Sequence, residues 1–115
     1  MGITTLHTLT KRADFLRVQA APRVGCESLV LHRLANPALQ AGEARIGYTV
    51  TKRCGNAVTR NRIKRRLRAV ARGMLPEQGQ GGMDYVLIGK PATATLSFDI
   101  LKRDFAYALR KGQKP

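Results

Sequence analysis

The segment between Gly55 and Gly73 constrains the fold most, because its apolar residues recur at three- and four-residue steps. On a helix, these residues would form one stripe that packs into a core. The stripe consists of Ile63, Leu67, Val70 and Met74. The opposite face would carry Asn61, Arg65, Arg68 and Arg72. Asn56 is suited to cap the helix at its N-terminus or to close the turn before it. The chain therefore needs a second layer on one side of this helix and presents cations on the other.

The charge of this region is one-sided. Residues 45–72 hold ten of the 21 Lys and Arg residues and none of the seven Asp and Glu residues, in a chain of net charge +14. A merely solvated helix face normally mixes both signs, whereas an uncompensated cluster repels itself unless a polyanion binds it. Arginine predominates, which favours forked contacts to phosphate. The partner expected from these charges is a nucleic acid.

Periodicity along the chain predicts a single α+β domain over residues 1–115. We expect a helix over 10–20, strands over 26–34 and 45–51, the basic helix, a strand over 85–89 and a helix over 96–111. This order predicts a two-layer sandwich of one sheet, mostly antiparallel or mixed, and three helices. Residues 74–82, with Pro76 and three glycines, read as a flexible connection. Residues 1–9 and 112–115 are expected to be loosely ordered tails.

Chemistry carried by the protein alone is not indicated. The seven carboxylates and two histidines are dispersed, whereas hydrolysis needs a positioned acid and base or clustered metal ligands. Cys26 and Cys54 are far apart and suggest neither a disulfide nor a zinc site. No apolar run approaches the length of a membrane span, and the first residues do not resemble an export signal. We therefore expect a cytoplasmic protein without a catalytic residue or a metal of its own.

A long ungapped motif resembles the signature of a known family. Its residues are Lys52, Arg53, Gly55, Asn56, Ala57, Val58, Arg60, Asn61, Arg62, Ile63, Lys64, Arg65 and Arg68. With the flanking segments, the chain is similar to the bacterial ribonuclease P protein subunit over essentially its whole length. The resemblance implies a fold like the second domain of ribosomal protein S5, with a left-handed βαβ crossover. Handedness could not be inferred from the residues, since such crossovers are right-handed in nearly all proteins.

The resemblance also implies a function. In that family the protein assists a catalytic RNA that removes the 5′ leader from precursor tRNA, and the RNA supplies both the active site and the bound magnesium. We expect a monomer in a 1:1 complex with the RNA, a lowered magnesium requirement and no cofactor on the protein itself. The residues expected to contact the catalytic RNA are Lys52, Arg53, Asn56, Arg60, Asn61, Arg62, Lys64, Arg65 and Arg68.

A second site implied by the resemblance is a cleft for the single-stranded leader, between the first helix and the sheet. Its expected residues are Phe15, Arg17, His32 and Tyr48. Aromatic rings suit this role because single strands are held by stacking together with cations. Relatives often carry aromatics where this chain has Gln19 and His32, so leader stacking is expected to be weaker or different. Phe15 could equally be a plain core residue, and His32 a surface histidine. Tyr48 and Thr49 point to opposite faces of their strand, and only one of those two faces can be the cleft.

Two other function classes fit the composition. A small basic ribosomal protein would share the size and charge, and would select ribosomal RNA. A DNA-reading helix would need a few base-reading side chains and usually a dimer, whereas this helix carries almost only Arg and Lys outside. Selectivity for a large catalytic RNA, a ribosomal RNA or duplex DNA separates the three.

Overall fold

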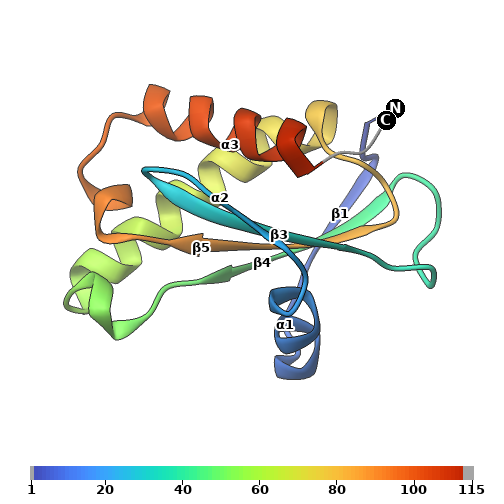
Figure 1. Ribbon diagram of the computed structural model, residues 1–115, viewed down its shortest axis with the longest axis horizontal. Helices are drawn as coiled ribbons and strands as arrows, with labels where there is room; N and C mark the ends of the chain where they lie inside the picture. The colour runs from blue at the N-terminus through green and yellow to red at the C-terminus, as the bar shows by residue number, and fades with distance from the viewer. Residues whose placement is uncertain (1, 113–115) are drawn as a thin grey trace.

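The computed structural model describes residues 2–112 and shows one five-stranded mixed sheet with three α-helices (Figure 1). Its elements are β1 (Thr5–Thr8), α1 (Arg12–Gln19), β2 (Arg23–Gly25), β3 (Leu29–Ala35), β4 (Glu43–Thr49), the 3-10 helix η1 (Lys52–Cys54), α2 (Ala57–Gln78), β5 (Met83–Gly89), the 3-10 helix η2 (Pro91–Ala94) and α3 (Phe98–Gly112). The strand order is β1-β4-β5-β3-β2. Helices α2 and α3 cover one face of the sheet, and α1 lies alone on the other. The predicted α+β class is confirmed.

The central strand β5 is buried on both faces, as its nearly continuous apolar sequence predicts. Tyr85 and Leu87 pack in the main core with residues of α2 and α3. Val86 points to the opposite face, where it joins a smaller cluster with Leu9 and with Val18 of α1. Because successive side chains along a strand point to opposite faces of the sheet, alternate residues of β5 pack into the two different cores.

Helix α2 continues beyond its predicted end at Gly73. Leu75 is fully buried in the core, and the carbonyl of Pro76 accepts a hydrogen bond of 2.8 Å from the backbone N–H of Ile3. The helix closes where Gly79 N–H donates to the Leu75 carbonyl, also at 2.8 Å. The expected flexible connection over 74–82 is therefore wrong for its first half. Burial of Leu75 outweighs the helix-breaking tendency of the glycine and the proline.

The N-terminal segment is an edge strand instead of the expected loose tail. Residues 5–8 pair in parallel with β4, in the register Thr5 to Glu43. Ile3 and Leu9, on either side of the strand, are both buried. Three isolated apolar residues, including Leu6, and the backbone pairing with β4 thus dock a segment whose composition is otherwise polar. At the other end, residues 113–115 of the expected tail lie outside the described residues.

Helix α2 connects two neighbouring parallel strands, β4 and β5, and so forms the expected crossover unit. The strand predicted over 26–34 is confirmed from residue 29 onward, where it is β3, whereas residues 26–28 form the turn of a hairpin in which β2 pairs antiparallel with β3. The left-handed sense of the crossover stays a prediction of the resemblance.

Candidate nucleic-acid interface

The N-terminus of α2 is capped by Asn56, as the sequence predicts. Its side-chain oxygen accepts a hydrogen bond of 2.9 Å from the backbone N–H of Thr59. Gly55 precedes it with φ of 136°, and a side chain there would also meet Thr59 at 3.1 Å. Such a backbone conformation is open to glycine and strained for other residues. This turn places Lys52 and Arg53 of η1 immediately before the positive end of the helix dipole.

The cations of η1 and of α2 as far as Arg68 form one surface, which we call the α2 cationic surface. It comprises Lys52, Arg53, Arg60, Arg62, Lys64, Arg65, Arg66 and Arg68. Among residues 2–112, the ion pairs within 4 Å involve α1, the strands, α3 and their loops, and none involves a member of this surface. Its charge is therefore not compensated within the described fold, so a bound polyanion would lower its self-repulsion.

Two shallow hollows indent this surface. The first, of about 480 Å³, is lined by Val58, Asn61, Lys64, Arg65 and Arg68. The second, of about 390 Å³, is lined by Arg62, Arg65, Arg66, Ala69 and Phe98. Arg65 belongs to both, because it lies on the ridge of α2 between them. The surface thus offers guanidinium groups around concave sites, which suits phosphate bound in a forked geometry.

Tyr48 lies beneath α2 and not beside α1. Its side chain packs against the main core, and the Arg68 guanidinium lies 5.6 Å from the centre of its ring. Burial raises the pKa of the Tyr48 hydroxyl, although the charges of Arg68 and Arg72 oppose the shift. The prediction that Tyr48 shares a cleft with Phe15 is wrong, because the parity of β4 places Tyr48 on the α2 face.

Phe15 packs across the backbone of β4 on the α1 face. A Cβ atom built on Gly47 would come within 2.5 Å of the Phe15 ring, so the close approach needs glycine. The ring borders a hollow of about 320 Å³, whose other lining residues are Thr10, Arg12, Leu16, Gln19 and Thr49. We call this the α1 hollow. The amide nitrogen of Gln19 donates to the Thr49 hydroxyl at 3.3 Å across it. Phe15 is thus both a packing residue and the aromatic wall of an open site.

Arg17 forms an ion pair with a buried carboxylate on β5, that of Asp84. Asp84 is fully buried and accepts two hydrogen bonds of 2.7 Å from Arg45, one from Arg17 and one of 3.1 Å from Asn36. Burial opposes ionisation of Asp84, but the hydrogen bonds from Arg45 and Arg17 outweigh it and lower its pKa. The hydrogen bonds that Arg45 donates to Asp84 in turn raise the pKa of Arg45. The Arg17 side chain remains 39% exposed, so Asp84 orients it without covering it.

His32 is on the expected face of the sheet but is only 7% exposed. One ring nitrogen, Nδ1, lies 2.9 Å from the carbonyl oxygen of Ala21 in the connection after α1. The prediction placed it in an open cleft, whereas the structure seats it under that connection. Of the four predicted cleft residues, Phe15 alone lines the α1 hollow.

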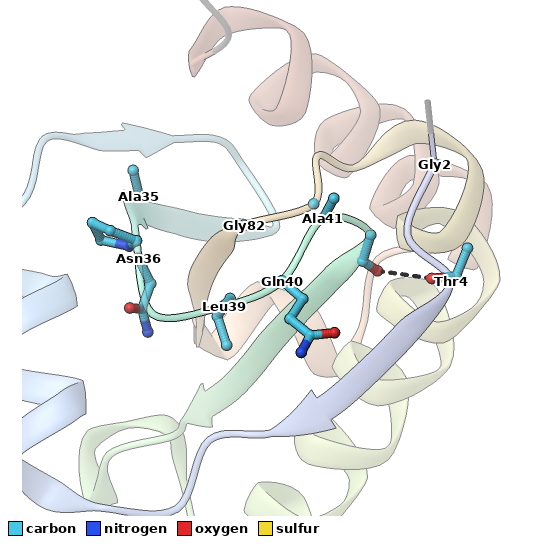
Figure 2. A pocket seen from close by; sticks show the side chains of 11 residues that line it. Gly2, Thr4, Ala35, Asn36, Leu39, Gln40, Ala41 and Gly82 are labelled. Carbon is cyan, nitrogen blue, oxygen red and sulfur yellow. Dashed lines mark hydrogen bonds between the residues drawn. The ribbon is translucent and has the colours of Figure 1, made fainter.

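A larger cavity, of about 560 Å³, lies at the opposite end of the sheet, between the β3–β4 loop and the N-terminal segment (Figure 2). Thr4 Oγ1 donates to the Gly42 carbonyl across it, at 3.3 Å. None of its described lining residues is charged. Size alone therefore does not make it a candidate for binding a polyanion.

Residues 2–112 contain no group of three His, Cys, Asp or Glu side chains that could hold a metal ion. Within the same range, no helix is both long and apolar enough to cross a membrane.

Comparison with known proteins gives one consistent family. The model of the family described as Ribonuclease P matches residues 3–113. The chain belongs to the ribonuclease P protein family. The ribonuclease P protein component of Ruegeria pomeroyi is 47% identical over 111 residues, covering 96% of this chain and 89% of the relative. That of Paramagnetospirillum magneticum is 42% identical, covering 92% and 82%.

The solved structures of ribonuclease P proteins share the fold of this chain. The protein of Staphylococcus aureus superposes with a TM-score of 0.77 at 23% identity, covering 93% of this chain and 95% of that one. The protein of Thermotoga maritima gives a TM-score of 0.74 at 23% identity, covering 94% and 99%. The predicted family and fold class are confirmed, and tRNA processing is the process in which this ribonuclease P protein takes part.

Within this ribonuclease P protein, the nine predicted RNA-contact residues lie together on η1, on α2 and, in the case of Asn56, at the N-cap of α2. Their contact with RNA stays a prediction. Sequence reasoning left out Arg66 and Phe98, which line a hollow with Arg62 and Arg65. Arg66 could have been found from its four-residue spacing after Arg62. Phe98 could not, because its proximity to α2 depends on how α3 packs.

Proposed function

We propose that this chain is the protein subunit of a bacterial ribonuclease P ribonucleoprotein and binds its catalytic RNA through the α2 cationic surface. One observation carries this proposal: eight cations of η1 and α2 have no carboxylate partner in the described fold. The family match favours this partner over ribosomal RNA or duplex DNA.

Its assistance would be electrostatic and positional. Removing the 5′ leader brings two polyanions together, the catalytic RNA and the precursor tRNA. Cations fixed on a folded surface release counterions from RNA and lower the repulsion that magnesium otherwise screens. The protein would therefore lower the magnesium requirement, while the RNA supplies the catalytic groups and binds the metal. We assign no catalytic residue to the protein, and we place a 1:1 complex with one protein monomer in the cytoplasm.

We assign the single-stranded leader to the α1 hollow. Phe15 supplies one face for base stacking, and Arg12 supplies a cation at the rim. Gln19 and Thr49 add an amide and a hydroxyl, which can hydrogen-bond to base edges. Arg17, held by Asp84, keeps exposed guanidinium surface for a leader phosphate. With one aromatic residue in the hollow, polar contacts would contribute more of the leader affinity than stacking does.

The test is cleavage of a leader-bearing precursor tRNA by a bacterial ribonuclease P RNA at low magnesium, with and without this protein. We expect strong stimulation, and no cleavage by the protein alone. If the folded protein gives no stimulation while the RNA is active at high magnesium, the chain is a basic RNA-binding domain of another complex.

A further inference from the structure

An exposed aromatic ring lies beside the α2 cationic surface. Phe98, the first residue of α3, is 39% exposed and lines the hollow that also contains Arg62, Arg65 and Arg66. Among the described residues it is one of four large apolar side chains that are exposed, with Leu16, Val58 and Tyr107. A half-exposed phenylalanine is unfavourable in water in proportion to its uncovered area, so a partner that covers the ring would be favoured.

Phe98 is not required to fix the start of α3. The Ser97 hydroxyl already accepts a hydrogen bond of 3.3 Å from the Ile100 N–H, which caps the helix. Leu96 and Leu101, on either side of the cap, both pack into the main core and set the entry of the chain. The cap and the two leucines therefore account for the start of α3 without the ring of Phe98.

Two arginines of this hollow are held in place by the backbone next to Phe98. Arg62 Nε donates to the Ala94 carbonyl at 3.0 Å, and Arg66 donates through Nη2 to the Leu96 carbonyl. Both carbonyls lie in the segment from η2 to α3, so the guanidinium groups and the ring are fixed on one rigid frame. Arg65 is exposed and lines the same hollow, and Ala69 lines it with a small side chain that leaves room.

We infer that this hollow binds one unpaired nucleotide of an RNA, whose base stacks on Phe98 while its phosphates are held by Arg62, Arg65 and Arg66. Stacking needs a base whose face is free, so duplex RNA cannot fill the site. The hollow would give the α2 cationic surface a preference for a bulged or looped nucleotide over regular helix. This inference rests on the proposed RNA-binding function and adds its ligand class.

The test uses three versions of one RNA hairpin, with a single bulged adenosine, with an abasic bulge and fully paired. The wild type should bind the adenosine bulge about 5- to 150-fold more tightly than the abasic bulge, the range expected for stacking of one base. Phe98→Ala should remove this ratio, and Phe98→Trp should retain it. Tyr107→Ala is the matched control, because Tyr107 is a 44% exposed aromatic residue of the same helix, nine residues further along.

Equal binding of the adenosine and abasic bulges by the wild type would overturn this inference and leave the proposed function intact. So would a Phe98→Ala protein that keeps the full preference. If the wild type binds neither the three hairpins nor the catalytic RNA, both this inference and the proposed function are overturned. Loss of the preference in Tyr107→Ala as well would show that the effect is not specific to Phe98, and would also contradict the assignment.

Discussion

Replacing Lys64 and Arg65 by alanine should weaken binding of the catalytic RNA and flatten its salt dependence. Both side chains are exposed, line the same hollow and have no carboxylate partner among the described residues. Alanine is the best helix former, so the double variant should remain folded. The expected effect is therefore on binding and not on the free energy of unfolding.

The size of the effect follows from counterion release. Each phosphate contact contributes about 0.7 to 0.9 to the slope of log K against log salt concentration, so two lost contacts lower the slope by about 1.4 to 1.8. Extrapolated from 1 M salt, where this contribution vanishes, the loss at 0.15 M is about 14- to 30-fold in affinity. The corresponding binding free energy is about 1.6 to 2.0 kcal/mol.

The assay is a binding titration with ribonuclease P RNA at several salt concentrations. Lys102→Ala with Arg110→Ala is the matched control, since it removes two exposed cations from α3 and lowers the net charge from +14 by the same two units. Circular dichroism and urea unfolding establish that each variant is folded. The control should keep a slope close to that of the wild type.

An equal fall in slope for both double variants would refute the reasoning, because net charge rather than a defined surface would then govern binding. An unchanged slope for Lys64→Ala with Arg65→Ala in a folded protein would remove these two residues from the interface.

Three further predictions concern stability and are measured by urea unfolding. Gly47→Ala forces a Cβ atom to 2.5 Å from the Phe15 ring and should cost about 1–3 kcal/mol, whereas Gly73→Ala meets no atom within 4 Å and should stabilise by about 0.5–1 kcal/mol. A similar loss at both glycines would contradict the packing of Phe15. Asp84→Asn leaves Arg45 and its neighbours without a buried counter-charge. Because breaking a buried ion pair costs about 3–5 kcal/mol, this variant should lose about 3 kcal/mol of unfolding free energy at pH 7. A loss below about 0.5 kcal/mol would contradict this. Because the folded pKa of Asp84 is lowered, its stabilisation is present above the unfolded value of about 3.9 and is lost as pH falls through the folded value. The wild type should therefore lose stability below about pH 4, and more steeply than Asp84→Asn; parallel pH profiles would exclude Asp84 as a source.

Helix periodicity predicted α2 well because its stripe is independent of distant residues. Ile63, Leu67 and Val70 are all buried as expected, and Asn56 caps the helix. The end of α2 could not be predicted, since Leu75, two residues after Gly73, is buried next to the docked N-terminal segment. Local propensity was overridden there by tertiary packing.

The α1 hollow shows why the positions of the predicted cleft residues were harder to infer from the sequence than those of the cations on α2. Strand parity sets Tyr48 and Thr49 on opposite faces, but the sequence alone does not say which face α1 covers. The contact of the Phe15 ring with Gly47 places α1 on the Thr49 face, and this contact joins segments that are far apart in the chain. The buried position of Asp84 is likewise set by Arg17 and Arg45, which come from two other elements.

The central claim is that the α2 cationic surface lowers the magnesium that the catalytic RNA requires. Its most direct test is the magnesium dependence of precursor tRNA cleavage, measured with the RNA alone, with the wild type, with Lys64→Ala and Arg65→Ala, and with Lys102→Ala and Arg110→Ala. We predict that the wild type and the α3 control shift the midpoint to the same lower magnesium concentration, and that the α2 variant shifts it less. Identical midpoints for all three proteins, or no shift by the wild type, would contradict the claim.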